Sequence, residues 1–201
     1  MPSPRSARLR VLAAILAGAC LLGADFKRPD PASFTLGTTT EREIRERFGE
    51  PSGETTVKVE GKAVARLQYT YVEVRSTVIP VRTIVFAFHE GRLVGFDYSS
   101  SFVADETVFD EAAASRIKRL ESTRAEVLAL VGKPTGQYIY PSTVVKTPGR
   151  HADVYSYSRT DKVSSTGTLN AFSKVLIVTF DDRDLVIETS LSITSTSHAT
   201  R

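Results

Sequence analysis

A short helical pattern with marked ends begins the regular part of the chain. Thr40 and Glu43 have the spacing of a capping box, in which a hydroxyl and a carboxylate each bond an unpaired backbone amide of the first turn. Ile44 and Phe48 share one face of the helix. Gly49 stands where helices end in the left-handed conformation, so the pattern predicts a helix of roughly two to three turns.

The same pattern recurs in the second half of the chain. Thr123 and Glu126 repeat the capping box. Val127 and Val131 repeat the apolar pair, and Gly132 repeats the terminal glycine. In both copies a proline follows shortly after the glycine and prevents the helix from continuing. The two stretches align without a gap, which indicates an internal repeat of one structural unit.

Segments that alternate between apolar and polar residues follow each helix, as in strands with one buried face. In the first copy these segments are 55–59, 67–71, 84–88 and 93–98, with turns at 60–61 and 89–92. In the second copy they are 155–157, 176–180 and 185–186, with a turn at 181–184. Because so short a helix is unstable alone, we expect each one to cover the apolar face of its sheet.

These patterns predict an α+β fold of two tandem helix-plus-antiparallel-sheet modules, with the helices packed on one face of the sheet. The modules span residues 34–102 and 103–192, and the polar residues 193–201 are expected to form a disordered tail. The second module should begin with another helix at residues 106–119, where alanines and spaced apolar residues favour one. Whether the two sheets join edge to edge or stay separate remains open.

Residues 1–19 have the form of a secretory signal peptide. Arg5, Arg8 and Arg10 give a positive start, and the apolar run that follows is shorter than the roughly 20 residues of a membrane span. These three arginines account for the formal net charge of +3, because removing them from the 26 basic residues leaves 23, equal to the acidic count. A mature chain with balanced charge has no electrostatic reason to bind nucleic acid.

The one cysteine, Cys20, stands at the end of this leader. The segment from Leu16 to Cys20 resembles the lipobox of bacterial lipoproteins. The resemblance implies that Cys20 is lipidated and that the protein faces the periplasm from the outer membrane. Two prolines and mixed charge in the segment that follows predict that residues 20–33 form a tether. Ala17 stands where that family usually has leucine. Cleavage by ordinary signal peptidase, which would leave the protein periplasmic and without lipid, is therefore the alternative.

The repeat itself resembles the small outer-membrane lipoproteins called BamE or SmpA/OmlA. The matching features are a helix that begins at threonine, a terminal Gly-x-Pro and an aromatic strand such as Tyr155-Ser156-Tyr157. Gly37 matches the turn glycine of that family in the first copy, but Leu120 takes this place in the second. The family has one copy, whereas two tandem copies are similar to the secreted β-lactamase inhibitor proteins. Both resemblances imply a protein-binding role.

Four tyrosines are the best candidates for contact with a partner. Tyr69 and Tyr71 lie two residues apart on one predicted strand, as do Tyr155 and Tyr157, so each pair faces one way. Exposed tyrosines would suit protein recognition, and the alternative is that they pack under the helices. Further candidates are the loops expected at 141–151 and 159–171.

The sequence contains no arrangement typical of catalysis. The histidines lack the spacing of metal ligands, and a run of aspartates fits a solvated hairpin turn better than a cation loop. These residues are His89, His151, His198, Asp181, Asp182 and Asp184. We therefore expect no enzymatic activity, metal or cofactor. The expected function is that of an envelope lipoprotein that binds other envelope proteins as a scaffold or accessory factor, for example in outer-membrane assembly. The alternative is a secreted inhibitor or binding protein.

Overall fold

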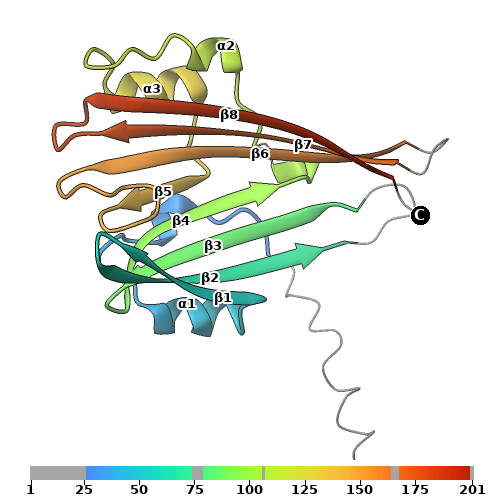
Figure 1. The fold of residues 1–201 in the computed structure, drawn as a ribbon, viewed down its shortest axis with the longest axis horizontal. Helices are drawn as coiled ribbons and strands as arrows, with labels where there is room; N and C mark the ends of the chain where they lie inside the picture. The colour runs from blue at the N-terminus through green and yellow to red at the C-terminus, as the bar shows by residue number, and fades with distance from the viewer. Residues whose placement is uncertain (1–25, 74–78, 106, 164–167, 200–201) are drawn as a thin grey trace, which may run out of the picture.

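One antiparallel sheet organises the described part of the chain. The computed structural model describes residues 26–73, 79–105, 107–163 and 168–199, so the predicted leader and Cys20 lie outside the described residues. Eight strands form the sheet in the order of the sequence, each hydrogen-bonded to the next (Figure 1). They are β1 (Gly53–Val59), β2 (Lys62–Val72), β3 (Val81–His89), β4 (Arg92–Ser100), β5 (Gly136–Ile139), β6 (His151–Val163), β7 (Thr168–Phe180) and β8 (Val186–Ala199).

Short helices accompany this sheet. Within the described residues they are α1 (Glu41–Phe48), α2 (Glu111–Ala114) and α3 (Arg124–Val131), with 3-10 turns η1 (Pro31–Ser33) and η2 (Val103–Asp105). Both predicted capping boxes are confirmed, since Thr40 and Thr123 exchange hydrogen bonds with Glu43 and Glu126. The glycines that end α1 and α3 have φ values of 78° and 85°, as the sequence predicts.

The prediction of two helix-plus-sheet modules is wrong, because the strands of both repeat copies form a single sheet that dominates the structure. The strands of the two repeat copies are joined through β5, which has only four residues. So short a strand shows no recognisable alternation of apolar and polar residues in the sequence. It pairs with β4 on one side and β6 on the other. Across the β4–β5 pairing, Gly95 opposes Tyr138 and Asp97 opposes Gly136. This pairing answers the question of whether the two sheets merge.

Two glycines allow β4 and β5 to approach each other. A Cβ atom on Gly136 would lie 2.4 Å from the Phe96 carbonyl oxygen and 2.8 Å from Asp97 Cα. A Cβ atom on Gly95 would lie 1.9 Å from the ring of Tyr138. Because both distances are far shorter than van der Waals contact, only glycine fits at either position.

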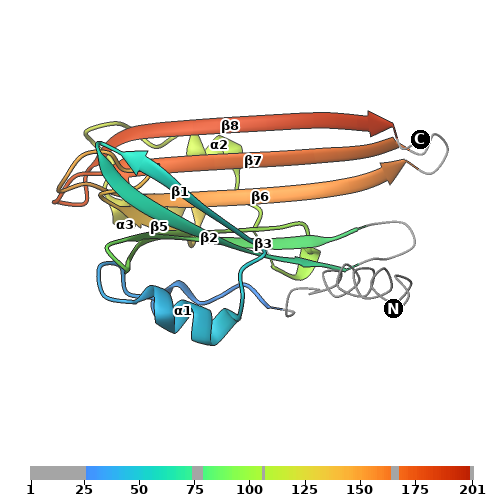
Figure 2. The same cartoon turned by 60° about the horizontal axis from the view of Figure 1, so that its bottom comes forward.

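The helices all cover one side of the sheet, which we call the helix face (Figure 2). Phe86 and Phe96 belong to an aromatic core under α1, and Tyr155 belongs to a second core under α2 and α3. Strand pairing places both cores on the same face. Phe96 lies opposite Gln137, and Gln137 lies opposite Asp153, so these side chains point to one side. Tyr155 follows Asp153 by two residues along β6 and therefore points to that side as well.

The second repeat copy contains less helix than its sequence predicts. Of the helix expected at residues 106–119, only Glu111–Ala114 is helical. The hydroxyl of Ser115 donates to a carbonyl of the preceding turn, and the chain then turns so that the Leu120 amide donates to the Val186 carbonyl at 2.7 Å. The helix ends early because the chain has to reach the edge of β8.

Two segments expected to be irregular are strands. β8 continues to Ala199 and pairs with β7 along its length, where the sequence predicts a disordered tail over 193–201. Most of the loop expected at 159–171 also belongs to β6 and β7. The polar composition of both segments suggested loops, but serine and threonine also fit strands whose faces are exposed.

The turn before each helix is equivalent in the two copies but differs in sequence. The Gly37 amide donates to the Leu93 carbonyl at 2.7 Å, just as the Leu120 amide donates to the Val186 carbonyl. Gly37 has a φ of 77° and Leu120 a φ of 61°. Leucine is strained in this region because its Cβ crowds the backbone, whereas glycine is not.

Leu120→Gly is therefore expected to raise the free energy of unfolding by about 1 kcal/mol. Leu120 is 58% exposed, so the lost packing is small. The matched change in the first copy, Gly37→Ala, should lower the free energy of unfolding by a similar amount. Urea unfolding followed by circular dichroism measures both changes. A loss of stability in Leu120→Gly would show that this residue is not strained.

Candidate protein-binding surface

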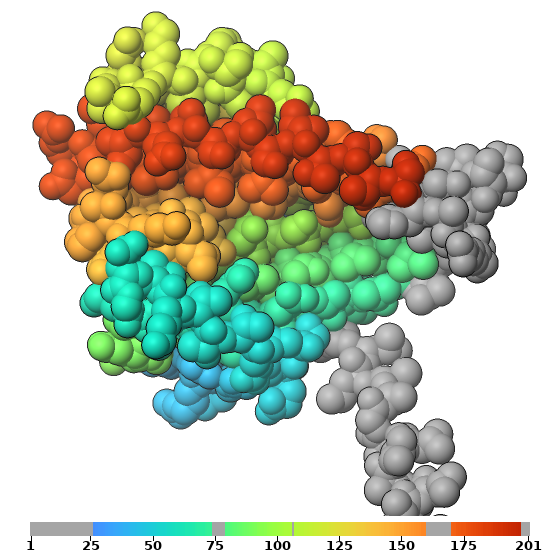
Figure 3. Space-filling view, in the orientation of Figure 1, coloured from blue at the N-terminus to red at the C-terminus, as the bar shows by residue number. Residues whose placement is uncertain are grey.

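The side of the sheet opposite the helix face carries no helix among the described residues, and we call it the open face (Figure 3). At one end of it the loop 140–150 folds against the β1–β2 hairpin. Val64, Tyr138, Val145 and Val154 form a third apolar cluster there. This cluster closes one end of the open face, and side chains at the other end stay half-exposed.

The uncovered end of the open face is lined by short side chains. The strand pairing places on this face the half-exposed residues Thr70, Thr83, Val85, Ser99, Ser158, Ser173 and Val175. The hydroxyl of Ser99 lies 3.3 Å from that of Ser158, and this contact links the two repeat copies. Short side chains lose little entropy on contact, so this surface suits binding to another folded protein.

Asp97 lies on the open face beside the β4–β5 junction. The Ser156 hydroxyl is 3.1 Å from both carboxylate oxygens, and the Thr135 hydroxyl is 3.5 Å from one of them. Burial raises the pKa of Asp97 to about 6, although these hydrogen bonds act to lower it. Among the described residues no cation forms an ion pair with Asp97, and Arg66 acts on it only at longer range. A carboxylate in this state is the strongest candidate for recognising a positive group.

Asp97→Asn is expected to stabilise the folded protein at neutral and alkaline pH. The pKa of about 6 lies above the ordinary value of 3.8, so the charged form is disfavoured in the folded state. This cost is fully present above about pH 6 and absent below about pH 4. The variant should gain about 3 kcal/mol in free energy of unfolding at about pH 8 and nothing at about pH 4, as measured by urea unfolding. Equal stabilities at about pH 8 would contradict this expectation.

The four candidate tyrosines all lie on the helix face. Tyr69 and Tyr155 are 4% and 2% exposed, and the Tyr69 hydroxyl donates to the Gly49 carbonyl at the end of α1. Tyr71 and Tyr157 are half-buried and lie farther along the same strands. For Tyr69 and Tyr155 the alternative interpretation is therefore correct, because both side chains pack under the helices. Contact of Tyr71 and Tyr157 with a partner stays a prediction.

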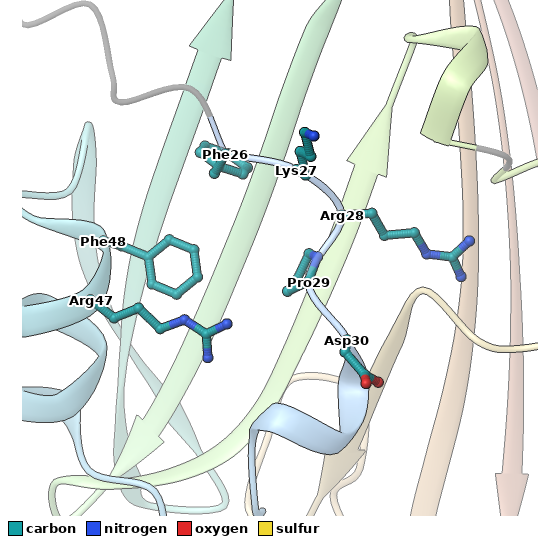
Figure 4. A pocket seen from close by; sticks show the side chains of 7 residues that line it. All are labelled: Phe26, Lys27, Arg28, Pro29, Asp30, Arg47 and Phe48. Carbon is teal, nitrogen blue, oxygen red and sulfur yellow. The ribbon is translucent and has the colours of Figure 1, made fainter.

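The chain from Phe26 onward packs against the body (Figure 4). The ring of Phe26 meets those of Phe48 and Tyr98 edge-on, with centroids 6.1 Å and 6.5 Å apart. Arg28 extends the other way, and its guanidinium group donates to the carbonyls of Asp105, Lys133 and Pro134. The segment thus contacts both repeat copies, within the stretch that the sequence predicts as a tether.

The acids beside the junction have structural roles, and His151 lies close to one of them. Asp153 is 0% exposed and accepts two hydrogen bonds from Arg124, at 2.8 Å and 2.9 Å. His151 Nε2 lies 2.9 Å from Asp184 Oδ1. Asp181 accepts the amides that form the predicted hairpin turn. These side chains hold a helix start and a turn, and the expectation of no enzymatic activity stays a prediction.

The described residues also contain no group of three or more histidine, cysteine or carboxylate side chains arranged to hold a metal ion. His89 bonds the Ala63 carbonyl, and His198 belongs to β8. In the same part of the chain, no helix has the length and apolar character needed to cross a membrane. The expected lack of a metal or cofactor stays a prediction.

Comparison with known proteins gives one distant likeness in three dimensions. No family model and no curated protein matches the chain. The chain is similar to a crystal structure described as a "putative beta-lactamase inhibitor protein" from Streptococcus mutans, with a TM-score of 0.44 and 13% sequence identity. The similarity covers 80% of this chain and 91% of that chain. The resemblance of the repeat to BamE stays a prediction.

Proposed function

We propose that the protein is a non-enzymatic envelope protein that binds a folded partner through its open face. The observation that carries this proposal is Asp97, a carboxylate whose charge costs folding stability beside a half-exposed surface of short side chains. Perturbed ionisable groups of this kind cluster at functional sites. A lysine or arginine of the partner placed against Asp97 would favour the charged form and offset that cost upon binding.

The arrangement of the sheet supports the same proposal. Because the helices occupy the helix face, the open face presents strands of both repeat copies side by side, with Asp97 beside the seam between them. The loop 140–150 borders this surface at one end. One partner can therefore contact both copies at once.

Site-specific photo-crosslinking in intact cells tests this surface. A photoreactive amino acid at Thr83 or Ser173 on the open face is expected to give one discrete adduct. The same group at Arg42 on α1, whose side chain is 82% exposed, should give none. Asp97→Lys, which would repel a cationic partner, should reduce the Thr83 adduct about tenfold, which corresponds to about 1.4 kcal/mol. Equal adducts from α1 and the open face, or none from the open face, would refute the proposal.

We further propose that lipid on Cys20 anchors the protein to the periplasmic side of the outer membrane. Its support is the lipobox-like sequence at the end of the leader. Intact mass and membrane fractionation, compared with Cys20→Ala, test the anchor: the wild type should carry diacylglycerol and partition with membranes, and the variant should not. If both are released after cleavage at another residue, the secreted binding or inhibitor protein becomes the better hypothesis.

A further inference from the structure

The outer edge of β8 is unpaired over most of its length in the described structure. Residues 188–197 are all exposed, including Leu191 at 44% and Ile193 at 50%. Only the start of the strand is covered, because backbone bonds from the 120–122 segment reach Val186 and Arg119 Nε donates to the Ile187 carbonyl. We call residues 188–196 the β8 edge; the strand lies at the outer border of the sheet in Figure 1.

The first repeat copy indicates which kind of structural element pairs with an edge like that of β8. β4 is the counterpart of β8, because Gly37 and Thr39 bond Leu93 as Leu120 and Ser122 bond Val186. Beyond that contact, β4 is paired with the antiparallel strand β5. The β8 edge is the equivalent position in the second copy, where no strand formed by the described residues pairs beyond β8. The repeat therefore points to an antiparallel strand as the occupant.

The two borders of the sheet differ in their protection against pairing. β1 is short and carries the exposed charges of Glu54 and Lys58, which discourage another strand from adding to it. Residues 189–199 of β8 include no Asp, Glu, Lys, Arg or Pro. A long, uncharged edge strand without such protection invites nonspecific association, so we expect a specific partner to cover it.

We propose that two copies of this chain pair through their β8 edges as an antiparallel, two-fold symmetric dimer with one continuous sheet. With the symmetry axis at Ser192, Leu191 lies opposite Ile193 of the partner subunit, and this contact occurs twice. The exposed apolar side chains then meet in one cluster on the helix face. Glu188 lies opposite Thr196 of the partner subunit, so no like charges meet, and the pairing stops where the 119–122 segment covers β8.

The sequence of the β8 edge favours this occupant over the alternatives. Pairing β8 with β1 of another copy would leave new edges at both ends and extend into a filament, whereas the two-fold arrangement closes. A foreign strand has no need of apolar residues placed symmetrically about Ser192. A two-fold axis one residue away, at Leu191 or Ile193, would leave one apolar side chain opposite threonine or serine.

Disulfide trapping of the purified full chain tests the pairing and its register together. A Cys20→Ala background makes each introduced thiol the only one in the chain. Directly opposed Cα atoms in antiparallel strands lie about 4.5–5.5 Å apart, within the range of a disulfide. Ser192→Cys should form a disulfide-linked dimer under mild oxidation. Thr189→Cys should form about tenfold less of the linked dimer, because in this register residue 189 faces Ser195 of the partner subunit and not a second cysteine. Mixing Thr189→Cys with Ser195→Cys chains should restore linkage, and Thr56→Cys on β1 is the matched control.

Sedimentation of the Cys20→Ala chain supplies an independent measurement. The chain should sediment at twice the monomer mass. Leu191→Lys combined with Ile193→Lys should shift it to the monomer with an unchanged circular dichroism spectrum, because both side chains are exposed. A chain that stays monomeric at every concentration, or a Ser192→Cys chain that links no faster than Thr56→Cys, would overturn the proposal. Linkage of Ser192→Cys in cells to a different protein would also overturn it.

Discussion

Gly136→Ala is expected to lower the free energy of unfolding by about 3 kcal/mol, although it adds a single methyl group. The new Cβ would lie 2.4 Å from the Phe96 carbonyl oxygen and 2.8 Å from Asp97 Cα. These are backbone atoms of β4, so the neighbour cannot move aside as a flexible side chain would. β5 would have to separate from β4, and the two repeat copies would lose their connection through the sheet. Urea unfolding followed by circular dichroism measures the loss.

Gly53→Ala is the matched control for this prediction. Gly53 also lies in a paired antiparallel strand, but its Cβ would meet only Gln68 Cβ, at an ordinary 3.9 Å. Its stability should stay within about 0.5 kcal/mol of the wild type. If Gly136→Ala were as stable as Gly53→Ala, the close approach of β4 and β5 would not depend on glycine.

Asp105→Ala is expected to cost about 3–5 kcal/mol, because it leaves the buried guanidinium group of Arg82 without its carboxylate. Arg82 donates to both Asp105 oxygens, at 2.8 Å and 3.2 Å, and the two residues are each 8% exposed. Tyr98 and Ser100 donate to the same carboxylate. A domain of ordinary stability, about 5–15 kcal/mol, would be close to unfolding after this change.

The pH dependence of this effect identifies its origin. Burial alone would raise the pKa of Asp105, but the hydrogen bonds from Arg82, Ser100 and Tyr98 outweigh it and hold the pKa below 3.8. A depressed pKa means that the carboxylate stabilises the fold above about pH 4 and loses this effect as the pH falls through the folded value. The difference between wild type and Asp105→Ala should therefore shrink in strongly acidic solution.

An exposed ion pair provides the control for Asp105. Arg42 and Glu46 lie 3.1 Å apart on α1, with side chains 82% and 60% exposed. Glu46→Ala should cost about 0.5 kcal/mol or less, because water screens such pairs. A comparable loss in the two variants would mean that burial contributes nothing to the effect at Asp105.

Local patterns predicted the two capped helices and the hairpin turns of this protein well, because the atoms that determine them are close in sequence, whereas only Glu111–Ala114 of the helix expected at 106–119 is helical. The capping boxes at Thr40 and Thr123 bond residues three positions away, and each pattern identified its helix. The turn predicted at residues 60–61 likewise appears, and both of its residues have a positive φ. None of these features depends on a distant part of the chain.

The joined sheet and the candidate site were beyond local patterns. β5 has four residues, and its place depends on Gly95, some forty residues earlier in the sequence. Asp97 is one acid among 23 in the sequence, and only its position beside Ser156 and Thr135 distinguishes it. The alternation of Gly95 and Asp97 on β4 was the one available signal, since small and polar residues interrupt an otherwise apolar strand. The four candidate tyrosines were predicted to contact a partner because of their side-chain chemistry, but Tyr69 and Tyr155 are buried.

The strand order has a consequence for how the chain folds. Each strand pairs with its neighbour in sequence, and most of these pairs close through short turns. Only β4 and β5 are separated by a long segment, so their pairing carries the greatest loop-closure entropy. We therefore expect each copy to assemble its own hairpins early and the junction to form last. Weakening an interaction that forms after the transition state raises the unfolding rate and hardly changes the folding rate. In a chevron experiment, Gly136→Ala should therefore accelerate unfolding and leave the refolding rate nearly unchanged.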